Sequence, residues 1–463
     1  MFLNLDQKAP EKIAIIDSNF QKCTYGDLCT FAQNWIDIIR ERCLIMILGD
    51  NTVGAVAGYL ACVITKKVPL IVSSSIKSDA LMHLKDTYSP QYIWAPKSIC
   101  TNPEHIIYEH YDYVLTKECG TIYPLYEELS LLLTTSGSTG SPKLVRHSYR
   151  NLEIQAENVS EFFELKSEDH ALVSLPIQYT MAISAINSHL YVGATLLMTD
   201  LSLLSPKFWS FVREQKASSI TGVPYSFEIM NRLKIYKQSF PDLKLLTQGG
   251  GKLPADIQVR FAEYIHQNGG KYIATYGQTE GTARMAYLPD EFSISKCGSI
   301  GKAIPNGHIT VVDTEGKEIS EPNQVGEMVF KGENVTLGYA ECGEDLIKGD
   351  ENSGILYTGD LIYKDEDGFI FIVGRKKRFL KLFGHRVSLD ECEQLIKNKF
   401  HIECACTGTD KVLKIYITDP QYVEPIKEYI LQTTELYANI LKCIVIDMIP
   451  KNEAGKTLYS QLS

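Results

Sequence analysis

The sequence lacks closely spaced cysteine motifs and any excess of basic residues. Its twelve cysteines are scattered, with no C-x-x-C spacing, and only Cys404 and Cys406 lie close together. Their alternating apolar neighbours are typical of one face of a strand. The scattered thiols favour a reduced, cytoplasmic setting. A net charge of -10 argues against a general nucleic-acid-binding protein, although one local basic site remains compatible with nucleotide binding.

Long apolar runs are also lacking. The longest apolar window, residues 53–65, is too short to cross a bilayer and is followed by Lys66 and Lys67. Asp6 falls where a signal peptide requires an apolar core. We therefore expect neither a membrane span nor a signal peptide, and we find no internal repeat or low-complexity tract. The remaining composition, 44% hydrophobic and 22% charged, is that of a globular protein, and 463 residues suffice for two or more domains.

Strand and helix patterns alternate along the first 290 residues, which is typical of an α/β fold with a parallel sheet. Strands are predicted at 12–17, 43–48, 68–72, 91–95, 171–175, 194–198, 219–222 and 243–247, and helices at 24–40, 52–65 and 148–163. Short β-like runs at 308–313, 326–331, 356–358 and 369–374 then predict a small antiparallel or barrel-like subdomain.

A basic run at 374–378 has the composition of an exposed linker, with a nuclear-targeting or nucleic-acid patch as the rival interpretation. Beyond it, two helices (388–399 and 424–436) and three β runs (404–407, 412–418 and 442–448) predict a small α+β domain. We therefore predict two domains, 1–375 and 376–463.

The stretch 131–151, LLLTTSGSTGSPKLVRHSYRN, combines an apolar run with a loop of Thr, Ser and Gly. Gly137 and Gly140 permit the positive φ that turns successive backbone N–H groups into one concavity, and Lys143 adds a cation. Such a loop can hold a polyphosphate. It is not a Walker A loop, because Pro142 precedes the lysine and Leu144 follows it. A flexible Ser/Gly linker is the competing interpretation.

Four further stretches have residue types that suit nucleotide chemistry. Residues 248–251, QGGG, allow a flat ring to lie against the backbone, or simply make a tight turn. Residues 276–280, YGQTE, offer an aromatic face, a hydroxyl and a carboxylate suited to Mg²⁺. Asp360, in YTGD, suits two ribose hydroxyls or a turn. Lys456, in NEAGK, is by itself most simply a solvated surface charge.

Taken together and in order, TTSGSTGSPK, YGQTE, YTGD, GRKKRFLKLFGHR and NEAGK closely resemble the core motifs of the adenylate-forming (AMP-binding) superfamily. That superfamily contains acyl- and aryl-CoA synthetases, nonribosomal peptide adenylation domains and luciferases, and the pattern here is most similar to acyl-CoA synthetases. The resemblance runs from about residue 12 to 460 and includes TYGDLCTFA near the N-terminus. It implies a large N-terminal domain of helix-flanked mixed sheets with a small distorted β-barrel, followed by a mobile α+β lid domain.

The resemblance also implies a two-step reaction. A carboxylate attacks the α-phosphorus of ATP and expels pyrophosphate, and the thiol of CoA or of a carrier-protein phosphopantetheine then takes the acyl group and releases AMP. Because a carboxylate is a poor nucleophile towards an anionic phosphate, charge neutralisation and alignment must provide the catalysis.

Residue roles follow from the same resemblance. The phosphate loop comprises Thr135, Ser136, Gly137, Ser138, Thr139, Gly140 and Lys143. Thr279 is expected on the α-phosphate, and Glu280 with Thr139 on Mg²⁺. Tyr276, Gly277, Gln278 and the backbone of Gly249, Gly250 and Gly251 are expected around adenine, with Asp360 and Arg375 on the ribose. Lys456 would bridge the substrate carboxylate and the α-phosphate, and Lys377 would be the hinge.

The sequence departs from the family pattern at several positions. Thr180 stands where amino-acid-activating members carry Asp, which leaves an ammonium unpaired and argues against α-amino acids. Ile372 replaces a frequent aromatic beneath the ribose, and Tyr459 replaces a common arginine, for which the sequence offers no account. The candidate acid pocket comprises Gln178, Tyr179, Thr180, Met181, Gln248 and Met285, with core packing as the alternative for each methionine.

The leading hypothesis is therefore a cytoplasmic ligase that uses ATP, Mg²⁺ and CoA to activate a non-amino carboxylic acid. A stand-alone adenylation enzyme that charges a carrier protein, including one that activates an amino acid, is the first alternative. A catalytically silent nucleotide-binding scaffold is a second, but Lys143, Thr279, Glu280, Asp360 and Lys456 are all present.

Overall fold

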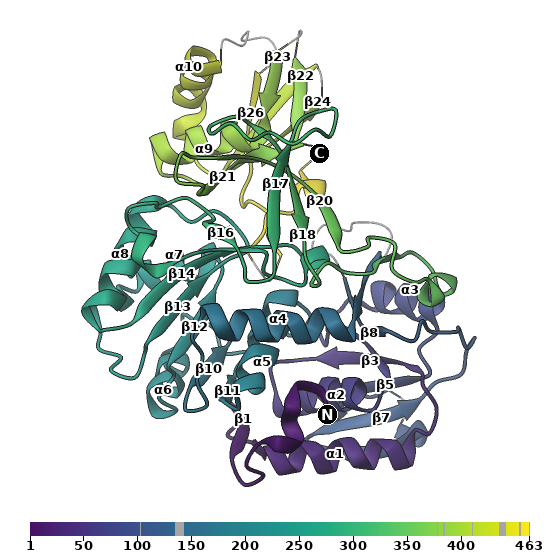
Figure 1. Ribbon diagram of the computed structural model, residues 1–463. Coiled ribbons are helices and arrows are strands. Elements are labelled where there is room, and N and C mark those ends of the chain that lie inside the picture. Colours follow the sequence, from purple (N-terminus) through teal and green to yellow (C-terminus); the bar gives the residue numbers. More distant parts are fainter. Residues whose placement is uncertain are drawn as a thin grey trace. The chain divides into compact units, whose positions relative to one another are not determined.

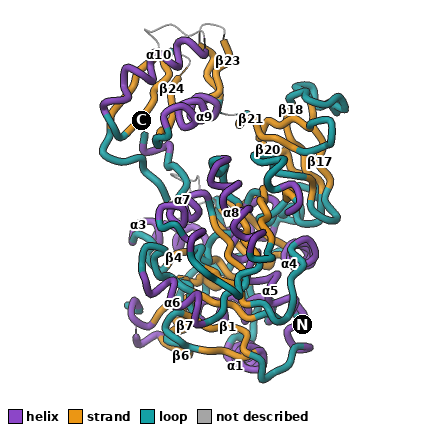
Figure 2. Tube along the Cα trace, turned by 90° about the vertical axis from the view of Figure 1, so that its left-hand side faces the viewer, coloured by secondary structure: helices purple, strands orange, loops and turns teal. Residues whose placement is uncertain are grey.

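The chain folds into two compact units (Figure 1). The computed structural model describes residues 1–101, 103–134, 143–376, 378–382, 385–409, 411–434, 441–452 and 455–462. Unit 1 comprises residues 1–297, 303–308 and 331–356, and unit 2 comprises 298–302, 309–330 and 357–463. Strands and helices alternate through unit 1 (Figure 2), so the α/β class predicted from the sequence is confirmed.

A nine-stranded mixed sheet forms one half of unit 1. Its order is β16 (Lys302–Ala303), β15 (Ala286–Leu288), β14 (Lys271–Tyr276), β13 (Leu245–Gln248), β12 (Ser219–Gly222), β10 (His170–Val173), β11 (Thr195–Met198), β1 (Ile13–Asp17) and β2 (Lys22–Thr24). The six strands from β14 to β1 in this order pair in parallel, and β15 and β2 pair with them antiparallel. The carboxyl ends of β13 and β14 therefore meet at one edge, which brings the QGGG and YGQTE stretches together.

An eight-stranded mixed sheet forms the other half. Its order is β19 (Gly338–Ala340), β9 (Leu144–Ser148), β8 (Leu129–Thr134), β4 (Val68–Ser73), β3 (Leu44–Gly49), β5 (Tyr92–Pro96), β7 (Tyr113–Lys117) and β6 (Ile106–His110). The central strands β8, β4, β3 and β5 pair in parallel. The strand β9 pairs antiparallel with both β8 and β19, so residues near 340 lie beside the end of the Ser/Thr/Gly loop.

The helices of unit 1 are α1 (Tyr25–Ile38), α2 (Val53–Ile64), α3 (Ser78–Tyr88), α4 (Tyr149–Phe162), α5 (Thr180–Val192), α6 (Pro206–Glu214), α7 (Pro224–Arg232) and α8 (Ala255–Gln267). Thr24 with Asp27 forms a capping box at the start of α1, and Ser148 with Asn151 forms another at α4. Both predicted helix starts are confirmed. One apolar core contains residues of both large sheets together with α2, α4 and α5.

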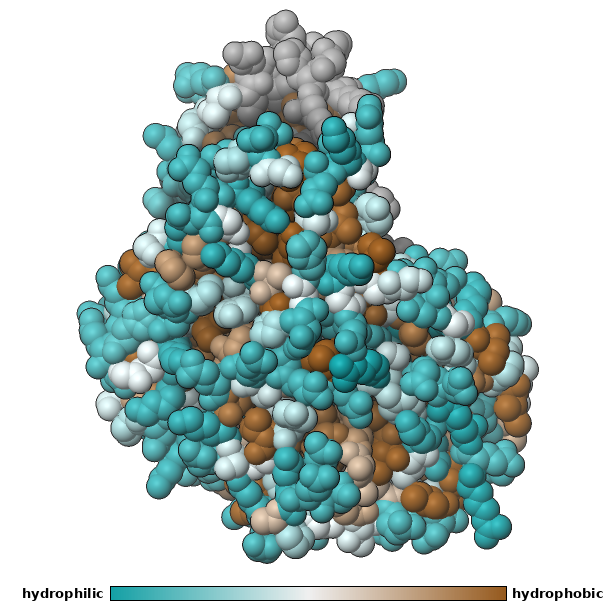
Figure 3. Space-filling view, viewed as in Figure 1, coloured by the Kyte–Doolittle hydropathy of each residue, from teal (hydrophilic) through white to brown (hydrophobic). Residues whose placement is uncertain are grey.

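Close packing in this core depends on glycine. A Cβ at Gly58 of α2 would lie 2.3 Å from the indole of Trp94, which donates from Nε1 to the carbonyl of Gly54 at 2.8 Å. On the face shown in Figure 3, hydrophilic residues cover most of the surface. Among the described residues, no helix is both long and apolar enough for a membrane crossing.

Unit 2 contains three smaller sheets. The largest has the order β17 (His308–Val312), β18 (Gly326–Lys331), β20 (Ile355–Lys364) and β21 (Ile370–Arg375), and the pairing of β20 with β21 is antiparallel. Because this order is linear in the described residues, the subdomain is an open sheet, and the barrel-like interpretation of the sequence is corrected. Short β-runs indicate strands, but closure depends on pairing between the first and last of them.

The C-terminal part of unit 2 has a two-stranded sheet, β22 (Phe379–Leu382) with β23 (His385–Ser388), and a three-stranded sheet, β24 (Cys404–Thr409), β25 (Val412–Ile417) and β26 (Leu441–Val445). The helices are α9 (Leu389–Phe400) and α10 (Val423–Thr434). Cys404 and Cys406 are buried in one apolar cluster, whereas Ala405 belongs to another. The two cysteines therefore share one strand face, as predicted.

Candidate active site

The predicted phosphate loop joins two paired strands. Residues 135–142, which include Thr135, Ser136, Gly137, Ser138, Thr139 and Gly140, lie outside the described residues, as does the predicted hinge Lys377. The loop leaves β8 and returns into β9, and Thr134 pairs with Leu144 across this antiparallel hairpin. Lys143 is the one predicted phosphate-binding residue of this loop that lies within the described residues.

Lys143 lies over the ring of Tyr339, a residue that the sequence analysis did not single out. Its Nζ is 3.6 Å from the ring centroid, and Glu341 Oε1 is 3.6 Å from the same nitrogen. Tyr339 lies on β19 and is paired with Val145 of β9. The ring thus holds the ammonium group of the lysine by a cation–π contact.

Tyr339 also contacts the carboxylate predicted for Mg²⁺. Its hydroxyl donates to Glu280 Oε1 at 2.7 Å. Burial, together with the negative charge of Glu280, raises the pKa of Tyr339 well above its ordinary value, so the phenol stays protonated and donates. One aromatic side chain therefore connects Lys143 and Glu280, which come from two separate sequence motifs.

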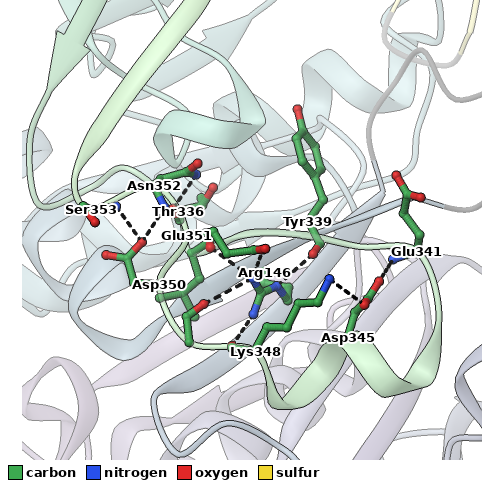
Figure 4. A network of polar contacts seen from close by, with 12 residues as sticks. Arg146, Thr336, Tyr339, Glu341, Asp345, Lys348, Asp350, Glu351, Asn352 and Ser353 are labelled. Carbon is green, nitrogen blue, oxygen red and sulfur yellow. Dashed lines mark hydrogen bonds and ion pairs between the residues drawn. The ribbon is translucent and has the colours of Figure 1, made fainter.

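A buried arginine fixes the segment that carries Tyr339. Arg146 on β9 is 0% exposed, and the chain from 337 to 351 surrounds it (Figure 4). Its nitrogens donate to the carbonyls of Tyr339 (3.0 Å), Leu337 (3.1 Å), Gly349 (3.3 Å) and Lys348, and to the carboxylate of Glu351 (2.5 Å). Figure 4 shows the ring of Tyr339 directed away from this arginine. Arg146 therefore holds the backbone of Tyr339 while its ring faces the site.

Thr279 and Glu280 lie on η5 (Thr279–Gly281), which begins after the two residues that follow β14. The Thr180 hydroxyl, at the start of α5, donates to the hydroxyl of Thr279 at 3.0 Å. Thr180, the neutral residue at the position where amino-acid-activating members carry Asp, thus contacts Thr279, which is predicted to bind the α-phosphate. A Cβ at Gly277 would lie 1.6 Å from the carbonyl oxygen of Ala283, so only glycine fits this turn.

The glycines after β13 lie against Met181. A Cβ at Gly249 would be 3.2 Å from the sulfur of Met181, and one at Gly250 would be 3.2 Å from its terminal methyl carbon. Gly250 has a φ of +80°, which glycine adopts most readily. The turn is closed by Gln248, which is 4% exposed and donates to the carbonyl oxygens of Gly249 (3.3 Å) and Gly251 (2.8 Å). Its amide is thus engaged within the turn.

The other predicted pocket and adenine residues are spread over the same unit. Gln178 and Met285 are buried, Tyr179 and Met181 are half-buried, and Met285 packs against Gly281. Gln278 donates to the Tyr276 hydroxyl at 3.2 Å. The buried positions of Gln248 and Met285 are compatible with the packing alternative that the sequence left open.

In unit 2, Asp360 and Arg375 form the predicted pair. They are opposite one another on β20 and β21, and Arg375 Nε donates to Asp360 Oδ1 at 3.0 Å. The Asp360 side chain is 3% exposed and that of Arg375 is 61% exposed. Pairing across the ladder therefore orients a buried carboxylate.

Lys456 lies on an exposed turn of unit 2. The backbone N–H of Lys456 donates to Asn452 Oδ1 at 2.9 Å, and that of Asn452 to the Lys456 carbonyl at 2.9 Å. Gly455, with φ +71°, permits the reversal. The Lys456 side chain is exposed, and these two hydrogen bonds fix the backbone of the turn that presents it.

Tyr459, unexplained by the sequence, has a structural role. Its hydroxyl donates to Glu393 Oε2 at 3.0 Å, and the guanidinium of Arg378 lies 3.7 Å from its ring centroid. Arg378 also donates to Glu393 Oε1 at 2.8 Å. Tyr459 therefore completes an ion-pair network that fixes the C-terminal segment.

Comparison with known proteins identifies the family. The family model of AMP-binding enzymes matches residues 4–340. The 2-succinylbenzoate–CoA ligase of Bacillus subtilis (strain 168) is 24% identical over 475 residues, which cover 98% of this chain and 96% of that protein. Oxalate–CoA ligase of Arabidopsis thaliana is 31% identical over 273 residues, which cover 58% of this chain and 52% of that protein.

A solved structure shares the fold over the full length. The o-succinylbenzoate CoA synthetase of Bacillus subtilis, in complex with its acyl-adenylate intermediate, matches with a TM-score of 0.81 at 22% identity, covering 100% of this chain and 97% of that one. The family model spans well over half of the sequence, and the chain therefore belongs to the family of AMP-binding enzymes.

Proposed function

We propose that the protein is an AMP-forming acid–CoA ligase that activates a carboxylic acid without an α-amino group. The observation that carries this proposal is the link from Lys143 through Tyr339 to Glu280, beside the strand hairpin that bears the Ser/Thr/Gly loop. A Mg²⁺-polyphosphate needs both a cation and a carboxylate, and the contact of both with one tyrosine side chain supports this proposal. The family relatives are named as CoA ligases, which supports CoA as the acceptor.

The residues fit this chemistry by type. Glu280 offers carboxylate oxygens, the ligands that Mg²⁺ prefers, and the bound ion would neutralise phosphate charge. Lys143 would bind the β- and γ-phosphates and Thr279 the α-phosphate. Asp360, oriented by Arg375, would accept from the ribose hydroxyls. Lys456 would contact the oxygens that gain charge as the acid attacks.

The reaction balances in two steps. In the first, the acid's carboxylate oxygen bonds to the α-phosphorus, and the bond from that phosphorus to the bridging oxygen breaks, so pyrophosphate leaves with its electron pair. In the second, the sulfur of CoA bonds to the acyl carbon, the bond to the phosphate oxygen of AMP breaks, and the thiol proton is released. Thr180 bears no charge that would pair with a substrate ammonium, which supports a non-amino acid.

The test is ATP–pyrophosphate exchange with Mg²⁺ across carboxylic acids grouped by size and by amino or hydroxy substituents. We expect exchange with a non-amino acid, and a loss of several hundred-fold or more in Lys456→Ala with nearly unchanged ATP affinity, because this contact strengthens in the transition state. Lys451→Ala is the matched control, since Lys451 lies in the same terminal segment but pairs with Glu403 at 2.5 Å.

Two results would contradict the proposal. Undiminished exchange in Lys456→Ala would remove the role of this lysine, and exchange driven by an amino acid would reverse the interpretation of Thr180. A direct comparison of CoA with a phosphopantetheinylated carrier protein as the second substrate then decides the acceptor.

A further inference from the structure

Arg284 is a buried arginine that has no acidic partner among the described residues. It is 1% exposed and follows η5 in the chain. Its Nε donates to the Ser184 hydroxyl at 3.3 Å and its Nη1 to the Thr275 hydroxyl at 2.8 Å, and the guanidinium lies 4.8 Å from the ring centroid of Phe163. Its Nη2 has no hydrogen-bond partner among the described residues.

The other large buried arginine of unit 1 shows how such a charge is normally accommodated. Arg146 is equally buried, but all of its terminal nitrogens donate, to four carbonyls and one carboxylate (Figure 4). In the part of the chain that the structure describes, Arg284 contacts two neutral hydroxyls and an aromatic ring. Burial lowers its pKa to about 9, so the guanidinium is still charged at neutral pH. A buried charge without a partner is costly to the folded state, so a binding partner for it would be stabilising.

The partners of Arg284 belong to the elements that build the candidate acid pocket. Ser184 lies one turn after Thr180 on α5, and Thr275 directly precedes Tyr276 on β14. The Thr275 hydroxyl is 2.7 Å from the point that a Cβ at Gly249 would occupy, and the sulfur of Met181 is 3.2 Å from the same point. The side chain of Thr275 therefore links the guanidinium of Arg284 to the place where Gly249 and Met181 meet.

We propose that Arg284 is an anion-binding residue of the acid pocket, and that the substrate is a dicarboxylic acid whose second carboxylate pairs with this guanidinium. The inference rests on the proposed function and names its substrate class. A guanidinium presents parallel N–H groups that match a carboxylate, and Nη2 is available for one of these bonds. The Ser184 hydroxyl accepts from Arg284 and can donate its own proton to the same anion, whereas the Thr275 hydroxyl donates to the carbonyl of Gln248 at 3.1 Å.

This assignment explains why a charged residue stands at this buried position. A structural ion pair requires an acidic partner, and Arg284 has none among the described residues. A residue kept only for packing would not need a charge. An anionic substrate group supplies the missing partner and is held at the far end of the acid from the carboxylate that is activated.

The experiment compares pairs of mono- and dicarboxylic acids of equal chain length in ATP–pyrophosphate exchange, with the full-length protein and its Arg284→Met and Arg284→Lys variants. For the unmodified protein, we expect kcat/KM to favour the dicarboxylic acid at least 10-fold. Arg284→Met should abolish this preference, mainly by raising the KM for the dicarboxylic acid. It should also raise kcat/KM for the monocarboxylic acid. Arg284→Lys should restore part of the preference, because a lysine keeps the charge but not the paired N–H groups.

Thermal unfolding separates substrate binding from a purely structural role. We expect Arg284→Met to unfold at the same temperature as the unmodified protein or a higher one, and to lose the stabilisation that a dicarboxylic acid confers. Arg146→Met is the matched control and should unfold at a clearly lower temperature, because it leaves four carbonyls and a carboxylate without their donor.

The outcomes distinguish the two proposals. Absence of exchange with every acid in the unmodified protein would refute the proposed function itself. If the unmodified protein shows exchange, but its preference between mono- and dicarboxylic acids is the same in Arg284→Met, the dicarboxylate inference alone is refuted. A fall in unfolding temperature in Arg284→Met as large as that in Arg146→Met would assign Arg284 a structural role and also overturn it.

Discussion

Tyr339 connects two motifs of the candidate site, and its two contacts can be separated by mutation. Tyr339→Phe removes the hydroxyl that donates to Glu280 at 2.7 Å but keeps the ring beneath Lys143. Tyr339→Leu removes both contacts. The two variants therefore test the hydrogen bond and the cation–π contact independently, while the backbone of residue 339 stays held by Arg146.

The magnitude follows from the kind of hydrogen bond. A hydrogen bond to a charged group contributes about 1.5–3 kcal/mol. Residues that orient a metal ligand typically change metal affinity by about 10- to 100-fold, equivalent to about 1.4–2.7 kcal/mol. The two ranges agree. We therefore expect Tyr339→Phe to raise the half-saturating Mg²⁺ concentration by about 10- to 100-fold, because Glu280 then has more freedom to rotate away from its Mg²⁺-binding orientation.

The assay is ATP–pyrophosphate exchange as a function of free Mg²⁺ at fixed ATP. Tyr339→Leu should also raise the KM for ATP, because Lys143 loses the ring that positions it. Tyr264→Phe is the control, since it removes a hydroxyl that donates to the carbonyl of Gln238 at 3.1 Å, outside the candidate site. An unchanged Mg²⁺ dependence in Tyr339→Phe would refute the view that this hydroxyl orients a metal ligand.

Two further predictions concern stability. Gly277→Ala should prevent folding or lower the unfolding temperature severely, because its Cβ would meet the rigid carbonyl of Ala283 at 1.6 Å, whereas Gly281→Ala meets only the flexible side chain of Met285 and should be milder; equal effects in calorimetry would contradict this. His189 is buried and its pKa is lowered to about 4 by desolvation, so the unfolded chain binds its proton more tightly and stability is lost as pH falls from about 6.5 towards 4. In urea unfolding between pH 7 and 5, the free energy of unfolding should fall less steeply in His189→Gln than in the unmodified protein. The same pH dependence in both would contradict this role of His189.

Elements with local signals were predictable from the sequence. Thr24 and Ser148 cap the helices that follow them, so both helix starts can be located from side chains that act within three residues. The QGGG and YGQTE stretches follow β13 and β14, whose parallel pairing places them at one sheet edge. The helix caps depend only on residues close in the chain. The shared sheet edge depends on one pairing of parallel strands, which the alternation of strand and helix patterns predicts.

The hairpin of β6 and β7 had no comparable signal. Its two-residue turn consists of Tyr111 and Asp112, with φ of 49° and 58°, whereas turns of this conformation usually contain Asn-Gly or Asp-Gly. The strain at Tyr111 is offset by tertiary contacts, including a tilted ring contact with Phe31 at 5.7 Å and a hydrogen bond from the Tyr111 hydroxyl to Cys23 at 3.2 Å. Tertiary structure, and not local preference, therefore selects this turn.

The residues that sequence reasoning missed act through long-range contacts. Tyr339 is 59 positions from Glu280, and Arg146 is 205 positions from Glu351. Tyr339 belongs to no motif, and Arg146 lies in the stretch 131–151 but outside its Ser/Thr/Gly loop. A lone tyrosine or arginine in a strand is most simply a packing residue. Their roles become visible through the pairing of β19 with β9, which the sequence alone does not reveal.

Arg146 and Arg284 show why residue type alone does not reveal function. Both are arginines at most 1% exposed in the same unit, and the sequence offers no reason to treat them differently. The first has five acceptors and fixes a loop, whereas the second has two hydroxyls and an Nη2 without a partner among the described residues. Because the cost of a buried charge depends on its partners, the difference between complete and incomplete hydrogen bonding separates a structural residue from a candidate ligand-binding one.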